Sequence, residues 1–367
     1  MSVIRSLKYK KLAYLIFCTK FIFMLFAEFI YSNYTKLGDT ERFLSASITF
    51  EPNILISSTK IMEFTGSIFS YLGTPFYHIP ALLLSYFGIV YLQRAIERIG
   101  GLDSKSNRII FFLLIAVPSF SIWTSIHSKE AVTAFCMCIL ASQLIASSLS
   151  LKSEVRLISY LALYLIAIFK PQYGIALVSC FIFIKVSRKY SLKAFTQLSF
   201  VFSIIIVQAY LLLGASDLID FYANNMYQYF NTSGDNSNST RINDIFVHDG
   251  DFFRNAPYGM LVAFIGPKWS EVVENPLFFP FYLESLFIIF LFLTLLTPFF
   301  KNLLKGKVNV FICSLVFLGL FWLLLVHYPF GIFNPGSAIR YRENFYPFIV
   351  ALFFLANAMH KNLNYRI

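Results

Sequence analysis

The chain has 367 residues, of which 57% are hydrophobic and only 13% are charged, and its mean hydropathy is +0.67. Soluble domains carry about 25% charged residues, so this composition excludes an ordinary soluble protein. The formal net charge is +11. No soluble basic segment is present that could form a nucleic-acid interface, so we expect no nucleic-acid partner.

Apolar runs recur along the whole chain. A helix needs roughly 17–25 mostly apolar residues to cross a hydrocarbon core about 30 Å thick. Runs that reach or approach this length occupy the segments 12–31, 76–95, 108–123, 130–149, 156–169, 173–186, 194–214, 282–300, 308–327 and 344–360. We therefore predict an all-α fold, a polytopic membrane helical bundle with about ten transmembrane helices. It forms a single integral membrane domain over residues 1–367.

The lysines and arginines divide unevenly between the two sides of such a bundle. Most of the 30 lie on the side of the N-terminus, namely Arg5, Lys8, Lys10, Lys11, Arg94, Arg98, Lys105, Arg108, Lys152, Arg156, Lys185, Arg188, Lys189, Lys193, Lys301, Lys305, Lys307, Lys361 and Arg366. The other side holds Lys36, Arg42, Lys60, Lys129, Lys170, Arg241, Arg254, Lys268, Arg340 and Arg342. By the positive-inside rule the first side is cytoplasmic, and so are both termini.

Two charged residues, Lys20 and Glu28, lie inside the first apolar run. A charge at the membrane centre costs roughly 2.5–3.5 kcal/mol on insertion scales, so such residues usually face a partner or water. A structural ion pair is the favoured interpretation, and a proton or ion pathway is the alternative.

The first long outer loop is expected over residues 32–77. It holds Asp39 and Arg42, and its apolar side chains between residues 61 and 72 recur at helical spacing. This spacing predicts an amphipathic helix in the membrane interface. Asp39 either caps a short helix at residues 40–42 or serves as the carboxylate of a reactive site.

Pro118 interrupts the run 108–123, and an outer corner follows it. Ser128 is predicted to cap the next helix, with Lys129 and Glu130 in its first turn. Glu130 suits the positive N-terminus of a helix, whereas Lys129 opposes it. We interpret Lys129 as a ligand for an anion; the alternative is a snorkelling lysine paired with Glu130.

Lys170 and Pro171 separate two runs that are each too short for an ordinary span. Pro171 cannot continue a helical hydrogen-bond ladder. The segment is therefore either a tight surface hairpin or a dip that lines a polar cavity, with Lys170 aimed inward.

The large outer loop is expected over residues 215–281. Its first part carries aromatic residues at helical spacing, residues 231–240 are polar, and its last part contains Arg254 and Lys268. A loop of this length is usually functional or disordered. In the last outer loop, Arg340 and Arg342 stand just before the final apolar run. They bind phosphate or form a salt bridge to Glu343 or another loop acid.

No Walker A sequence, G-x-S-x-G, H-E-x-x-H or C-x-x-C pair is present, the histidines are scattered, and the cysteines fall within apolar runs. We therefore expect neither metal nor cofactor. The outer cations and carboxylates suit an anionic, lipid-borne substrate. The candidate catalytic residues are Asp39 and Glu130, and the candidate substrate-binding residues are Arg42, Lys129, Lys170, Arg254, Lys268, Arg340 and Arg342.

Three short stretches resemble those of bacterial O-antigen and capsule repeat-unit polymerases of the Wzy type. They are Pro118-Ser119-Phe120 to Trp123 with Ser128-Lys129-Glu130-Ala131, then Lys170-Pro171-Gln172, and Arg340-Tyr341-Arg342 through Tyr346-Pro347. The resemblance implies a bacterial inner-membrane enzyme, a glycosyltransferase-type polymerase in lipopolysaccharide biosynthesis. Its substrate would be an oligosaccharide on undecaprenyl pyrophosphate, and it would be surrounded by membrane lipid. Its partners would be a flippase and a chain-length regulator. A C-type glycosyltransferase with a lipid-phosphate sugar donor, or a lipid-linked oligosaccharide flippase or transporter, is the alternative.

Overall fold

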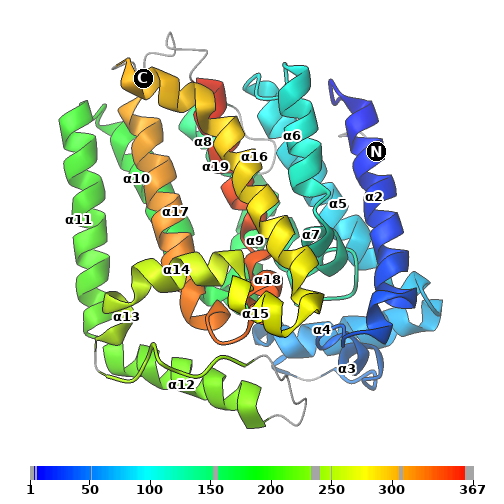
Figure 1. Cartoon of the computed structure of the whole chain (residues 1–367). Helices are drawn as coiled ribbons and strands as arrows, with labels where there is room; N and C mark the ends of the chain where they lie inside the picture. The colour runs from blue at the N-terminus through cyan, green and yellow to red at the C-terminus, as the bar shows by residue number, and fades with distance from the viewer. Residues whose placement is uncertain are drawn as a thin grey trace. The chain divides into compact units, whose positions relative to one another are not determined.

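A computed structural model describes residues 4, 6–50, 52–151, 156–232, 240–248, 250–305 and 309–359. Within these ranges the chain is helical and has no strand (Figure 1). Five of the expected cytoplasmic cations (Arg5, Lys152, Lys307, Lys361 and Arg366) lie outside the described residues, as does most of the polar stretch 231–240.

Among the described residues, six helical segments are long and apolar enough to cross a membrane: Lys10–Asn33, Phe76–Arg98, Lys129–Ser148, Ala194–Leu213, Pro276–Leu304 and Val310–Gly331. Each corresponds to one of the ten apolar runs in the sequence. The helices indicate a multi-pass membrane protein and confirm the all-α prediction.

The other four runs form shorter helices. Three of these are α9 (Arg156–Phe169), α10 (Gly174–Lys189) and α19 (Tyr346–Met359). The run 108–123 is divided into α6 (Lys105–Ile115) and α7 (Pro118–Trp123), with the break at Pro118 as predicted. A proline has no N–H for the helix ladder, so it begins a helix more readily than it continues one.

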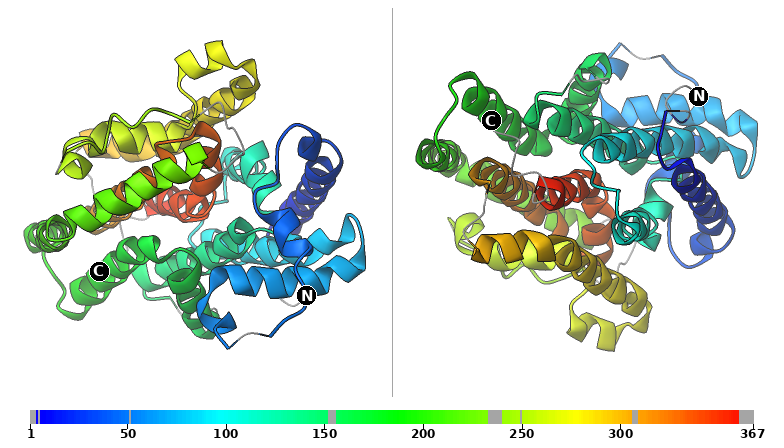
Figure 2. Two further views of the ribbon diagram at one scale, coloured as in Figure 1. Left: turned by 90° about the horizontal axis from the view of Figure 1, so that it is seen from below. Right: turned by 90° about the horizontal axis from the view of Figure 1, so that it is seen from above.

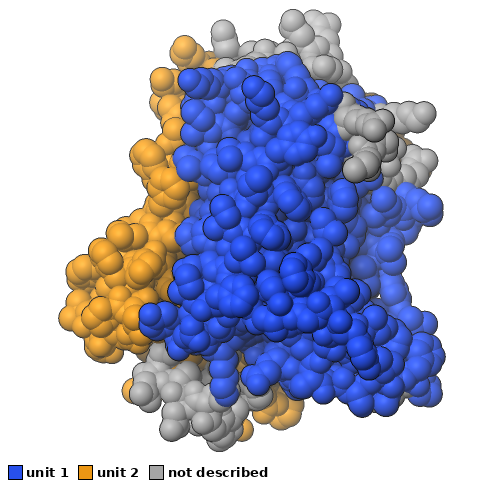
Figure 3. All heavy atoms as spheres, turned by 90° about the vertical axis from the view of Figure 1, so that its right-hand side faces the viewer, with its two compact units in different colours: residues 1–174, 343–358 blue, residues 175–342, 359–367 orange. Residues whose placement is uncertain are grey.

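The chain forms two compact units, which Figure 3 shows in different colours. Unit 1 comprises residues 1–174 and 343–358. Its main helices are α2 (Lys10–Phe29), α4 (Ser58–Phe69), α5 (Ile79–Arg98), α8 (Lys129–Ser148), α9 and α19. Helix α5 packs closely on α8, because a Cβ atom at Gly88 would meet the backbone of Phe135 and the side chain of Cys138.

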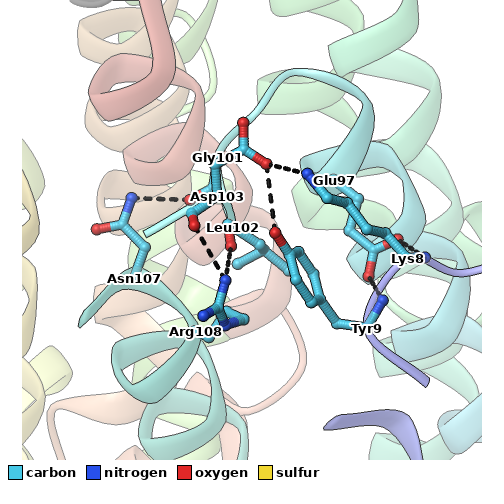
Figure 4. Close-up of polar contacts among 8 residues, drawn as sticks. All are labelled: Lys8, Tyr9, Glu97, Gly101, Leu102, Asp103, Asn107 and Arg108. Atoms are coloured by element: carbon cyan, nitrogen blue, oxygen red, sulfur yellow. Dashed lines mark hydrogen bonds and ion pairs between the residues drawn. The ribbon is translucent and has the colours of Figure 1, made fainter. Parts of the chain in front are cut away.

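One end of unit 1 is held by polar contacts of the N-terminal segment (Figure 4). Glu97 accepts hydrogen bonds from the backbone N–H groups of Lys8 and Tyr9, and the Lys8 ammonium lies 2.7 Å from Asp103. The ring of Tyr9 lies against the guanidinium of Arg108. These contacts join the segment before α2 to the end of α5 and to the start of α6.

The two charged residues of α2 do not pair with each other, so the expectation of an ion pair is wrong for Lys20. Its ammonium is fully buried, donates to Thr124 Oγ1 and lies over the ring of Phe120. Glu28 instead accepts hydrogen bonds from Tyr77 and from His78. Two turns of helix separate the two charges, so each meets a different neighbour along α2.

Unit 2 comprises residues 175–342 and 359–367. Its described elements are α10, α11 (Ala194–Leu213), α12 (Ser216–Thr232), α13 (Asp251–Arg254), α14 (Ala256–Ile265), α15 (Trp269–Glu274), α16 (Phe279–Leu304), α17 (Val310–Gly331) and α18 (Pro335–Arg342). Helix α17 contacts α11, α12, α14 and α18. Helix α12 runs across the end of unit 2 rather than along its long helices (Figures 1 and 2).

Candidate functional site

The corner between α7 and α8 makes hydrogen bonds to several neighbouring segments of unit 1. The carbonyl of His127 accepts a hydrogen bond from Thr40 Oγ1 at 3.0 Å, and His127 Nε2 donates to the carbonyl of Met62 at 3.1 Å. The backbone N–H of His127 donates to Nδ1 of His78 at 3.1 Å. Since Nδ1 accepts this bond, Nε2 of His78 carries the proton that is donated to Glu28. The corner thus ties α2, α3 (Thr40–Leu44), α4 and the start of α5 together.

Close packing of α3 on α4 depends on a glycine. A Cβ atom at Gly66 would clash with the backbone carbonyl of Phe43 and reach the ring of His127. Phe43 is buried between α4 and the corner, and its ring lies edge-on to that of His127. This packing fixes the position of α3, and with it the charged residues that α3 carries.

Three cations from three helices gather around α3 and α4. The Arg42 guanidinium and the Lys129 ammonium both lie against the ring of Phe43, at 5.0 and 5.8 Å from its centroid. Lys129 also donates to Thr59 Oγ1 at 2.9 Å, and so reaches the first turn of α4 from the start of α8. Lys60, the third cation, lies in the same first turn of α4. Ser128 caps α8 through the N–H of Ala131, as predicted.

A cavity of about 350 Å³ opens beside these cations. Its described lining residues are Arg42, Ser45, Ala46, Ser47, Thr49, Ile54, Lys60, Glu63 and Phe64. Glu63 lies between the two cations of this set, 3.7 Å from Arg42 Nε and 3.5 Å from Lys60 Nζ. The cavity can therefore receive an anionic group and, next to it, a hydroxyl-bearing one.

The two candidate catalytic carboxylates have different surroundings. Asp39 occupies the N-cap position of α3, but its side chain makes no capping hydrogen bond and instead lies 3.4 Å from Arg42. The structure therefore contradicts the alternative that the Asp39 side chain caps the short helix. Glu130 lies in the first turn of α8 and is only 1% exposed. Asp39 is partly exposed to solvent, whereas Glu130 is enclosed by protein.

Lys170 follows α9 and precedes the short 3-10 turn Pro171–Tyr173. It is half-buried, and its backbone N–H closes the end of α9 on Ile166. The ring of Tyr173 packs on that of Phe345 within unit 1. The short turn contains the predicted break, and an inward role for the Lys170 side chain stays a prediction.

Arg342, at the end of α18, is completely buried and already paired. Its Nη2 donates to Glu284 Oε1 at 2.8 Å, and its Nη1 donates to Ser285 Oγ at 2.8 Å and to the carbonyl of Phe264 at 3.2 Å. A fully buried guanidinium requires such a partner, because an unpaired charge inside a protein is very costly. The alternative of a salt bridge is thus realised, but with an acid of α16 rather than with a loop acid.

The other candidate cations of unit 2 are more open. Arg254 ends α13 and is exposed, while Arg340 is half-buried beside Tyr341. Lys268 lies over the ring of Tyr258, 5.3 Å from its centroid. Lys129, Arg42 and Asp39 come together in unit 1.

Sequence reasoning missed the role of Arg241. Its guanidinium holds both carboxylate oxygens of Glu271 and donates to the carbonyls of Gly266 and Ile332. Burial raises the pKa of Glu271, but the bonds from Arg241 outweigh it and hold that pKa below its usual value. Arg241 thereby ties the large outer loop to the chain after α17. A signal was present: an arginine on the outer side, where the positive-inside rule does not account for it.

Comparison with known proteins identifies no relative: no family model, no curated protein and no solved structure matches this chain. Within the described ranges, no group of three or more histidine, cysteine, aspartate or glutamate side chains could hold a metal ion.

Proposed function

We propose that the chain is a multi-pass protein of the bacterial inner membrane that polymerises oligosaccharide repeat units carried on undecaprenyl pyrophosphate. The reaction would take place at the periplasmic face, in the synthesis of O-antigen or a similar surface polysaccharide. The observation that carries this proposal is the gathering of Arg42, Lys60 and Lys129 with Asp39 and Glu63 around α3 and α4, beside a polar cavity.

The charges of this group suit the proposed transfer. A sugar hydroxyl attacks the anomeric carbon of the growing chain, the bond from that carbon to the pyrophosphate oxygen breaks, and the pyrophosphate leaves on its lipid. Cations stabilise the negative charge that develops on the leaving group, while a carboxylate accepts the proton of the attacking hydroxyl. Asp39, held on α3 beside Arg42, is the proposed acceptor; enclosed Glu130 is the second candidate.

The proposed topology has about ten crossings with both termini in the cytoplasm. The four shorter helical segments supply the crossings beyond the six long helices. Helix α9 with 14 residues is about 21 Å long, so it needs flanking residues or a locally thinned bilayer to span. Residues 32–77 and 215–281 then face the periplasm, where α4 and α12 lie in the interface.

A deletion strain tests the activity. We expect it to make lipopolysaccharide capped by a single repeat unit, with lipid-linked units accumulating on the periplasmic leaflet. A flippase would instead leave the lipid-linked units on the cytoplasmic leaflet. A C-type glycosyltransferase with a lipid-monophosphate donor would leave polymer length unchanged and remove one sugar from the repeat. A chain-length regulator and a flippase are the proposed partners. Loss of the regulator should change the modal length of the polymer, and loss of the flippase should abolish the supply of lipid-linked units to the periplasmic face.

A further inference from the structure

The cavity beside α3 and α4 has a chemistry more specific than a general attraction for anions. Among its described lining residues, Arg42 and Lys60 are cationic, and Ser45, Ser47 and Thr49 carry hydroxyl groups. Arginine presents five N–H donors and lysine three, and hydroxyl groups can donate as well. Such donors suit the oxygens of a phosphate or diphosphate group.

The ion pairs around Glu63 leave room for such a ligand. Glu63 lies 3.7 Å from Arg42 and 3.5 Å from Lys60, and Asp39 lies 3.4 Å from Arg42. Charge-assisted hydrogen bonds are about 2.7–2.9 Å long, so these contacts are looser than direct hydrogen bonds. By contrast, the pair Arg342–Glu284 has the short distance of a structural bridge, 2.8 Å. Arg42 can therefore exchange a loose carboxylate contact for a phosphate oxygen, and Lys60 belongs to the same cavity lining.

Exposed apolar side chains flank the cavity. Ser47 and Thr49 line the cavity, whereas Ile48 and Phe50 are 52% and 75% exposed. Leu55 and Ile56, which follow the lining residue Ile54, are 63% and 76% exposed. Exposed apolar side chains around a polar cavity fit an amphiphile. Its polar head would enter the cavity, and its apolar chain would lie along these exposed side chains.

We propose that this cavity binds the diphosphate head of a polyprenyl lipid through Arg42 and Lys60, with Glu63 next to the sugar that the diphosphate carries. The assignment rests on the proposed function, because it makes the cavity the subsite for the lipid-linked substrate. It assigns Arg42 and Lys60 to the diphosphate and Glu63 to the sugar, and it separates these residues from Arg342, whose charge is held inside unit 2.

Direct binding to the full-length protein in detergent micelles tests this site without any polymerisation. Three probes separate the possible sources of affinity: geranylgeranyl diphosphate, inorganic pyrophosphate and geranylgeraniol. We expect geranylgeranyl diphosphate to bind at least about tenfold more tightly than either of the other two. Lys60→Met and Arg42→Gln should each weaken it by about tenfold, and Lys60→Arg should restore most of the affinity. Lys36→Met, an exposed outer-loop cation outside the cavity lining, is the matched control and should bind like wild type.

Several results would overturn the site. Unchanged affinity in Lys60→Met and Arg42→Gln, with unaltered thermal melting, places the lipid elsewhere. If pyrophosphate binds as tightly as geranylgeranyl diphosphate, the cavity is a site for free anions and does not recognise a lipid. If geranylgeraniol binds equally tightly, the affinity comes from an apolar surface and not from the cations. Polymer length in cells is read separately. Normal polymer from a Lys60→Met protein that no longer binds the probe removes the cavity from the reaction, and the phenotype of the deletion strain then decides the proposed function by itself.

Discussion

The guanidinium of Arg342 lies 2.8 Å from the carboxylate of Glu284, and both side chains are almost completely buried within unit 2. The pair joins the end of α18 to the second turn of α16, and Ser285 and the carbonyl of Phe264 occupy further N–H groups of the arginine. A buried charge that is this well satisfied stabilises the arrangement of the outer elements of unit 2.

Arg342→Ala should therefore destabilise the protein before it affects any ligand. Removing one member of a buried ion pair leaves an uncompensated charge and costs about 3–5 kcal/mol. We expect a clear fall in melting temperature of the purified protein in detergent and a reduced protein level in cells. Arg342→Lys should rescue stability only in part, because lysine cannot reproduce the planar fork of donors.

A double variant separates stability from binding at this position. Arg342→Met combined with Glu284→Leu removes both charges and keeps similar volumes, a replacement that is often neutral for stability. If the double variant is stable and makes long polymer, Arg342 is structural. Stable protein without polymer would instead show that Arg342 contributes to substrate binding as well.

Local features of unit 1 could be predicted from the sequence because they depend on neighbouring residues. Pro118 begins α7, Ser128 caps α8, and the helix expected between residues 61 and 72 forms as α4 with its 3-10 extension. Each depends on short-range rules of helix capping, proline geometry or apolar spacing.

The partners of charged residues could not be predicted, because they come from distant parts of the chain. Hydropathy placed Glu284 inside an apolar run but gave no indication that Arg342 would meet it. Lys20 likewise reaches Thr124 rather than Glu28 of its own helix. Hydrophobic periodicity reports which side of a helix is apolar, whereas the neighbour of a polar group is decided by tertiary packing. The cavity with Lys60 and Glu63 was missed for the same reason.

Asp39→Asn should abolish polymer while leaving the fold intact. Asparagine fits the N-cap position as well as aspartate does, and no capping bond is lost, since the Asp39 side chain makes none. The contact with Arg42 is solvent-exposed and contributes at most about 1 kcal/mol to stability. Polymer length is measured by gel electrophoresis of lipopolysaccharide, and Glu41→Gln, on the same short helix, is the control. Wild-type polymer from Asp39→Asn would remove Asp39 from the mechanism and make Glu130 the next residue to test.

Gly66→Ala should loosen α3 from α4. The added methyl group would meet the carbonyl of Phe43 and the His127 ring, and such overpacking costs about 1–3 kcal/mol. We expect a lower melting temperature and shorter or no polymer, because α3 carries Asp39 and Arg42. Gly174→Ala is a matched control: Gly174 has ordinary helical backbone angles and nothing within 4 Å of the position of a Cβ atom. Equal stability of the two variants would contradict the role given to this packing.

The stability of the corner at His127 should fall in mild acid. Burial lowers the pKa of the His127 imidazole, although the bond to the carbonyl of Met62 acts in the opposite direction. Above the unfolded value of about 6.5, the imidazole is neutral in both states and the full stability is present. As the pH falls below that value, the unfolded chain takes up a proton first, so stability is lost until the pH reaches the lower folded pKa.

Thermal melting between about pH 8 and about pH 5 checks this dependence. The melting temperature of the wild type should be level at the upper end and decline below about pH 6.5. His127→Gln keeps an N–H donor for the carbonyl of Met62 but does not titrate, so its decline should be smaller. His248→Gln, at an exposed position of unit 2, should follow the wild type. If His127→Gln declines as steeply as the wild type, the acid sensitivity arises elsewhere and the buried neutral imidazole is not its cause.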